Sequence, residues 1–426
     1  MNGLVSGYGI AGGYRKKERK MYRRRQVLRW MAAAAAAVFL AGCAGDADHS
    51  DQEAETETGK ADESGEAEKG YDLPVDEEET EAAQEDCTEM LSLAADVCPE
   101  ILEETPVLLS DDMTEQAAET VAGEGVPAAG TDLYRGLKNH DLMERFLRDC
   151  ESGKEGSIVT YEIYDDGRIG RKKFICDGED MYLLAVTASW KDGQAVLGNV
   201  SYSRMREWSF TEKGWFFYEL CTPEYPEVTE VIYSNAMMRV VPLEEEYAKV
   251  TEAFLEPVAY NGNNLFWTDW DAEHMDGIDY NGLFEYLYEM RTGKDFDKAQ
   301  YQDGIPGGQF EELMTAALPV TTEQLRGYAA YDAENERYEW ISLGVGNRTL
   351  GPLTGAIPEV VGMEENGDGT VTLTVDAVCE STADDAFLTH YLTIQMDEED
   401  PVRYLSNVVA EGQEDALPEY VYRIQR

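Results

Sequence analysis

The stretch SIVTYEIYDDGRIGRKKFICDGEDMYLLAVTASW, residues 157–190, decides the fold. Apolar and polar residues alternate in three of its runs, SIVTYEIY, RKKFIC and MYLLAVTASW, which is the period of a β-strand. The segments DDGR and DGED between them have the composition of tight hairpin turns. Two further runs, VLGNVSYS and GWFFYELC, follow after KDGQ and TEKG. Residues 157–221 therefore predict an antiparallel meander of about five or six strands.

Helical spacing precedes the meander, at residues 87–104 and 131–150, with a Gly/Ala/Pro-rich connection at 121–130. The second half repeats this order. Helices are predicted there at 243–255, 282–290 and 309–318, with a short one after a capping box formed by Thr321 and Gln324. Strands are predicted at residues 337–343, 370–379, 388–396 and 403–409.

The predicted fold class is therefore α+β, with two tandem domains that each place helices before an antiparallel sheet. Cystatin and nuclear-transport-factor folds share this order, an analogy that carries no function. We expect a helix and loose connection at residues 87–130, a first α+β domain at 131–240 and a second at 241–426.

The start of the chain has the layout of an export signal. Arginines in residues 23–29 precede a short apolar segment, Trp30–Leu40, which is too short for the roughly 20 residues of a spanning helix. The next residues, Leu40-Ala41-Gly42-Cys43, resemble the lipobox of bacterial lipoproteins. That resemblance implies cleavage between Gly42 and Cys43, a diacylglycerol on the Cys43 sulfur, and a lipid-anchored protein on the extracytoplasmic face of the cell membrane.

Residues 1–43 are accordingly expected to be a lipoprotein signal peptide. Its first 20 residues make the segment before the apolar stretch unusually long for such a signal. KKERK directly before Met21 suggests a translated ribosome-binding site, so we expect the true start at Met21. The segment RRQVLR also loosely resembles a twin-arginine export motif, and both export routes stay open.

Charge is distributed unevenly along the chain, whose net charge is −51. Residues 44–86 hold 18 acidic side chains against two lysines and have few large apolar groups, so we expect a disordered acidic tether. The remaining residues are also strongly acidic. This charge excludes nucleic acid as a partner, because phosphate contacts need a basic face.

The C-terminal third resembles a group of uncharacterised lipoproteins of gut clostridia. The segments ALPVTTEQLRGYAAYD, YEWISLGVGN, DGTVTLTVDAVC and LTHYLTIQ carry the likeness. It implies only a lipid-anchored domain of unknown function.

Six cysteines lie beyond Cys43. An even number outside the cytoplasm permits disulfides, but six in so long a chain is sparse. Cys87 and Cys98 are expected on one helix, about 16 Å apart and beyond bridging distance. We therefore expect most of the six to be small core residues.

Cys379 and His390 form the first candidate catalytic pair. Alternation in VTLTVDAVC and LTHYLTIQM puts both side chains on the inward face of predicted strands. If these strands pair as a hairpin, a thiol and an imidazole become neighbours, as in a nucleophile and its base. Packing in the core is the alternative.

A second candidate site lies in YNGNNLFWTDWDAEHMDGIDYNGLFEYLYEM, residues 260–290. Trp267 and Trp270 alternate there with Asp269, Asp271 and Glu273, and aromatic faces beside carboxylates suit a sugar ring or a pair of hydrolytic acids. A connecting loop with docked aromatics and solvated acids is the alternative. No GxSxG, HExxH, SxxK or glycine-rich phosphate loop occurs. We expect no metal or other cofactor, since the chain has four histidines and no CxxC motif.

These observations favour a non-catalytic binding module at the cell envelope, with a glycan, a peptide or an envelope protein as ligand. An envelope hydrolase that uses Cys379 and His390, or carboxylates of the 266–279 segment, is the alternative.

Overall fold

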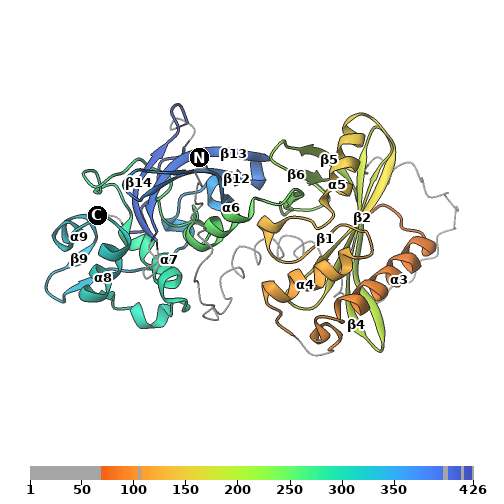
Figure 1. The fold of residues 1–426 in the computed structure, drawn as a ribbon, viewed down its shortest axis with the longest axis horizontal. Coiled ribbons are helices and arrows are strands. Elements are labelled where there is room, and N and C mark those ends of the chain that lie inside the picture. Colours follow the sequence, from red (N-terminus) through yellow and green to blue (C-terminus); the bar gives the residue numbers. More distant parts are fainter. Residues whose placement is uncertain (1–68, 104–106, 397–401, 414–416, 425–426) are drawn as a thin grey trace, which may run out of the picture. The chain divides into compact units, whose positions relative to one another are not determined.

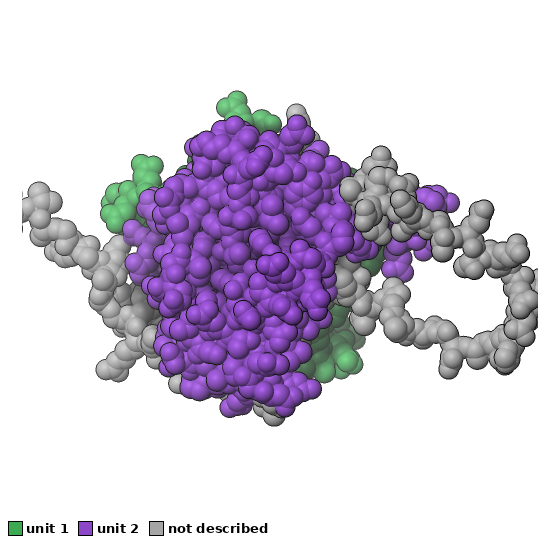
Figure 2. All heavy atoms as spheres, turned by 90° about the vertical axis from the view of Figure 1, so that its right-hand side faces the viewer, with its two compact units in different colours: residues 1–22, 250–376, 388–426 green, residues 23–249, 377–387 purple. Residues whose placement is uncertain are grey.

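The computed structural model of the chain describes residues 69–103, 107–396, 402–413 and 417–424 (Figure 1). Contacts divide them into two compact units, coloured in Figure 2. Unit 2 holds the described residues up to Lys249 and also Ala377–Phe387, whereas unit 1 holds Val250–Asp376 and the described residues from Leu388 onward. The expected domain boundary lay between residues 240 and 241. Residues 377–387, between the strands predicted at 370–379 and 388–396, were not expected in unit 2. The expected signal peptide, with Gly42 and Cys43, lies outside the described residues.

The predicted meander forms five strands of the seven-stranded sheet of unit 2, in which the strands follow one another in chain order, and the first and last strands of the sheet lie outside the predicted stretch. Its members are β1 (Ala128–Ala129), β2 (Gly156–Ile163), β3 (Ile169–Cys176), β4 (Met181–Lys191), β5 (Gln194–Phe210), β6 (Trp215–Leu220) and β7 (Asn235–Arg239). All neighbours are antiparallel except β1 and β2, which are parallel. Gly167 and Gly193 take the positive φ angles, +80° and +83°, of the turns predicted at DDGR and KDGQ.

Helices pack on both faces of this sheet, because alternate residues of each strand enter different cores. Ile169 of β3 packs with α3 (Glu77–Ala94) and α4 (Asp111–Ala122), while Phe174 of the same strand packs with α5 (His140–Glu151). The sequence predicted α5 in part and missed α4, whose alanine-rich face carries a weak apolar signal.

The α3 helix begins at Glu77, inside the segment that was expected to be a tether up to residue 86. The Asp76 side chain caps it by accepting a hydrogen bond from the Glu79 backbone N–H at 2.7 Å, and the acids of its first turn suit the helix dipole. Arg171 on β3, only 3 % exposed, donates to Asp86 at 2.8 Å. The acidic composition that predicted a tether is thus partly neutralised by an arginine of the sheet. The helix ends at Ala94, so Cys98 lies beyond it rather than on the same helix as Cys87.

Unit 1 contains most of the helices and strands predicted in the second half. Helix α6 (Glu245–Val250) begins at the end of unit 2 and continues into a π-helical turn, Thr251–Leu255, in unit 1. The other helices of unit 1 are α7 (Tyr280–Thr292), α8 (Gly307–Ala317) and α9 (Thr322–Tyr328). The predicted capping box is present, with the Thr321 hydroxyl accepting from Gln324 N and Gln324 Oε1 accepting from Thr321 N.

Two sheets complete this half of the chain. The smaller one pairs β8 (Ile305–Pro306), β10 (Arg337–Tyr338) and β9 (Tyr331–Asp332), and the larger one has the order β11 (Ile357–Glu365), β12 (Val371–Cys379), β13 (Asp384–Gln395) and β14 (Arg403–Val409). The strand predicted at 337–343 shrinks to two residues. Strand β11 was missed because Pro358 and Gly362 interrupt its pattern.

A buried ion pair holds the C-terminal segment of unit 1. Arg423 is 1 % exposed, and its guanidinium lies 2.8 Å from Glu285 on α7. The same guanidinium donates to the Gly262 carbonyl at 3.1 Å, and the Arg423 backbone N–H donates to Asp279 at 2.8 Å. Tyr420 also donates to Asp279, at 3.0 Å. Arg423 therefore ties the final described residues to the core.

Candidate functional site

His390 on β13 is fully buried between two polar partners. Its Nδ1 lies 2.6 Å from Asn407 Oδ1, and its Nε2 lies 3.0 Å from the Tyr260 hydroxyl. Asn407 uses its amide N–H to reach the Thr268 carbonyl, so its oxygen accepts from Nδ1–H, and Nε2 accepts from Tyr260. Burial lowers the pKa of His390 to about 4, which keeps the imidazole neutral.

Cys379, the other half of the predicted pair, is the last residue of β12 and is 1 % exposed. Its Sγ lies 3.3 Å from the Ser381 hydroxyl. A hydrogen bond of 2.6 Å between Thr389 and Asp376 places the middle of β13 beside Asp376, which precedes Cys379 on β12. Since both nitrogens of His390 bond other side chains, the imidazole is not positioned as the base of the Cys379 thiol.

The structure instead brings Tyr233 to Cys379 and to the two residues that follow it, Glu380 and Ser381. We call these four residues the tip cluster. Glu380 begins a 3₁₀ turn, Glu380–Thr382, and Asn235 on β7 donates to the Ser381 carbonyl at 3.4 Å. Burial raises the pKa of the Glu380 carboxyl to about 6, although a hydrogen bond from Tyr233 has the opposite effect and lowers this pKa. A carboxyl of that pKa exchanges protons near neutral pH, as a general acid or base must.

Sequence reasoning missed this cluster. The one available signal was the adjacency of Glu380 to Cys379 at the end of a predicted strand. Tyr233 is distant in the chain, and nothing in its local sequence ties it to them.

The tryptophans of the second candidate site face the interior. Trp267 and Trp270 are 4 % and 3 % exposed. The Trp267 indole N–H donates to the Tyr260 carbonyl at 2.8 Å, and that of Trp270 donates to the Leu265 carbonyl at 2.7 Å. The Trp270 backbone also bridges to Asn407 on β14. Neither indole offers an open face on which a sugar ring would stack.

The carboxylates of the same loop are exposed and shape local turns. Asp269 accepts from the Val409 backbone N–H at 2.7 Å. Asp271 accepts from the Glu273 N–H at 2.8 Å, and its carboxylate lies 2.9 Å from the His274 ring nitrogen. Both bonds lower the pKa of Asp271, and the bond from Glu273 has the larger effect. Glu273 is exposed as well. The loop therefore buries its aromatic residues and presents its acids to solvent.

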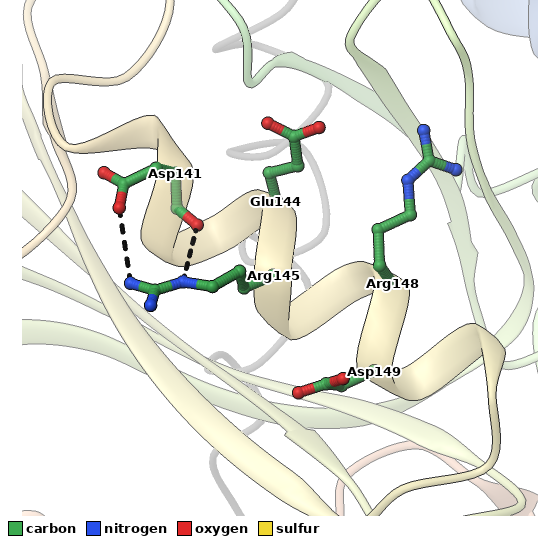
Figure 3. A pocket seen from close by; sticks show the side chains of 5 residues that line it. All are labelled: Asp141, Glu144, Arg145, Arg148 and Asp149. Atoms are coloured by element: carbon green, nitrogen blue, oxygen red, sulfur yellow. Dashed lines mark hydrogen bonds and ion pairs between the residues drawn. The ribbon is translucent and has the colours of Figure 1, made fainter.

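A shallow hollow lies along the exposed side of α5 (Figure 3). Its lining side chains are all charged, and Arg145 turns back toward Asp141, with its Nη2 3.3 Å from the carboxylate. The other lining residues are Glu144, Arg148 and Asp149. Such mixed charge on one helix is typical of a solvated face.

Within the described ranges, no three His, Cys, Asp or Glu side chains are grouped closely enough to hold a metal ion. None of the helices described there combines the length and the apolar character needed to span a bilayer. Neither the curated proteins nor the solved structures include a match to this chain. A model of a family of unknown function, DUF6070, matches residues 77–423, and the chain therefore belongs to that family.

Proposed function

We propose that this protein is anchored by lipid on Cys43 to the extracytoplasmic face of the cell membrane, where it acts as a non-catalytic binding module. The lipobox Leu40-Ala41-Gly42-Cys43, behind a basic and then an apolar segment, supports the anchor. The resemblance of the C-terminal third to clostridial lipoproteins points the same way.

The observation that carries the binding role is the position of the candidate catalytic and stacking groups. His390, Trp267 and Trp270 are buried. His390 joins Tyr260 to Asn407 on β14, and the two indole N–H groups donate to carbonyls within the 260–270 segment. A catalytic group has to meet substrate, and these side chains instead hold the 260–270 segment together and, through His390, bond it to the sheet.

The exposed acids indicate the class of ligand. Asp269, Asp271 and Glu273 reach solvent from one loop, in a chain of net charge −51. Carboxylates that steer an encounter favour a cationic partner, which at the envelope would be a basic segment of a peptide or protein. A glycan fits less well, because it would need one of the buried indoles.

The anchor is tested by replacing Cys43 with serine. The wild-type protein is expected to fractionate with membranes and to incorporate labelled fatty acid, while Cys43→Ser loses both properties because the hydroxyl accepts no thioether-linked lipid. A matched Cys87→Ser variant should stay in the membrane fraction. Lipid labelling that persists in Cys43→Ser would contradict the anchor.

The ligand class is tested with a fluorescent oligolysine peptide and a neutral Gln/Ser peptide of equal length. We expect only the oligolysine to bind, more weakly as salt rises, and Glu273→Lys to reduce its affinity by about threefold. Glu334→Lys is the control: it reverses the charge of an exposed residue elsewhere in unit 1 and should reduce the affinity for oligolysine less. Equal losses in the two variants would mean that the loop is not the binding surface.

A hydrolase remains the second candidate because of the tip cluster, which sets a proton-exchanging Glu380 beside the Cys379 thiol. Hydrolysis of an envelope peptide or glycan that disappears in Glu380→Gln, while the fold stays intact, would favour it over the binding module.

A further inference from the structure

We propose that Cys150 and Cys176 are joined by a disulfide bond in the exported protein. The oxidising surroundings that this needs rest on the location proposed above, whereas the pairing itself rests on the geometry of unit 2.

The two cysteines face one core. Cys150 lies in the last turn of α5 and Cys176 is the last residue of β3; they are 7 % and 5 % exposed and belong to the same buried cluster. Between them the chain turns directly from α5 into β2, whose first residue, Gly156, is the Cα partner of Cys176. The turn thus returns the chain from Cys150 to the strand end that carries Cys176.

The segments just after the two cysteines touch. Gly153 and Gly178 both have positive φ angles, +75° and +95°. A Cβ placed on Gly178 would lie 3.4 Å from the Gly153 carbonyl oxygen, an ordinary van der Waals contact. Cys150 and Cys176 therefore sit at the base of two adjacent turns and point into the core below them.

The Cys176 thiol also lies close enough to act on the Cys150 thiol. Burial raises the pKa of Cys150, and the neighbouring Cys176 thiol raises it further. The other cysteines in the described ranges meet different groups: Cys87 meets Arg171 and Asp86, Cys98 meets Glu100, Cys221 meets Gly70 and Arg204, and Cys379 meets Ser381. Cys87 and Cys98 also share a buried cluster, but neither thiol acts on the other. Among the cysteines of the described residues, Cys150 and Cys176 are therefore the pair whose thiols interact.

The reaction is a thiol–disulfide exchange with an oxidant of the disulfide class, such as an envelope disulfide oxidoreductase or oxidised glutathione. Each thiol loses a proton, a bond forms between the two sulfurs, and the two electrons released reduce the oxidant's disulfide to two thiols. Because the thiolate is the nucleophile and burial disfavours it, we place this step before the core closes around Cys150.

The test uses full-length protein in detergent, unfolded and refolded with a mixture of oxidised and reduced glutathione, then alkylated and digested without reductant. We expect a linked pair of peptides that contain Cys150 and Cys176, while Cys87, Cys98, Cys221 and Cys379 are alkylated. Alkylation of all six cysteines after this refolding would overturn the pairing, as would a linked pair that involves another cysteine.

Stability provides an independent readout. The melting temperature of the oxidised wild type should fall by about 5–10 °C on addition of dithiothreitol, since the closed loop no longer restricts the unfolded chain. The Cys150→Ser/Cys176→Ser variant should not respond to dithiothreitol, and Cys379→Ser should respond like the wild type. Alkylation in intact cells separates the two proposals: a bond that forms on refolding but not in cells contradicts the location, and one that forms in neither contradicts the pairing.

Discussion

Replacement of Arg423 by methionine is expected to lower the free energy of unfolding by about 3–5 kcal/mol. The Arg423 side chain is fully buried and that of Glu285 is 10 % exposed, with 2.8 Å between the charged groups. Removal of the guanidinium leaves the Glu285 carboxylate in the core without its counter-charge, and it also removes the donor to the Gly262 carbonyl. Urea unfolding followed by tryptophan fluorescence measures the loss.

A double-mutant cycle separates this mechanism from a loss of packing. Glu285→Gln in the Arg423→Met background is expected to recover part of the stability, because a neutral amide costs less to bury than an unpaired carboxylate. Arg326→Met, which removes a half-exposed partner of Glu311, is the matched control and should cost no more than about 1 kcal/mol. If the double variant were less stable than Arg423→Met alone, the unpaired charge would not be the cause.

The second large effect is a dependence of stability on pH that originates in His390. Burial lowers the pKa of His390 from 6.5 to about 4 in the folded protein. Between these values the unfolded chain binds a proton that the folded protein excludes. The stabilisation is therefore complete above pH 6.5 and is lost as the pH falls toward 4, by about 3 kcal/mol in total. Below the folded pKa no further loss arises from this residue.

The measurement compares the free energy of unfolding of wild type and His390→Gln across this range. Glutamine does not titrate, so the stability difference between the two proteins should shrink as the pH falls. Glu380 acts in the opposite direction, because its pKa is raised from 4.5 to about 6 on folding. Both proteins should therefore also carry Glu380→Gln. Parallel pH curves for the pair would show that His390 is not the titrating group.

Local sequence predicted the elements whose signals are short-range. The turns at DDGR and KDGQ, the capping box at Thr321, and strand β14 at 403–409 all depend on residues near each other in the chain. Strand β11 and helix α4 escaped detection, because their apolar pattern is interrupted or weak. The start of α3 was misjudged because the arginine that neutralises its acids, Arg171, is supplied by a distant strand.

The candidate sites show the same division. Alternation indicated that Cys379 and His390 point inward, and both are buried. It did not indicate which residues they would meet, since Asn407, Tyr260 and Tyr233 reach them only through the pairing of strands and the docking of a loop. The tryptophan loop was recognised by composition alone, which does not distinguish a buried indole from an exposed one.

The sequence by itself determined the α+β class, the meander at its centre and the excess of negative charge, and it carries the resemblance of Leu40–Cys43 to a lipobox. These follow from hydrophobic periodicity, turn chemistry and composition, which act over a few residues. Only the tertiary structure decided that Arg423 belongs to the core, that Tyr233 rather than His390 lies beside Cys379 and Glu380, and that Cys150 faces Cys176. Each of these depends on the desolvation and the contacts that arise when segments distant in the chain pack together, and no local pattern encodes them.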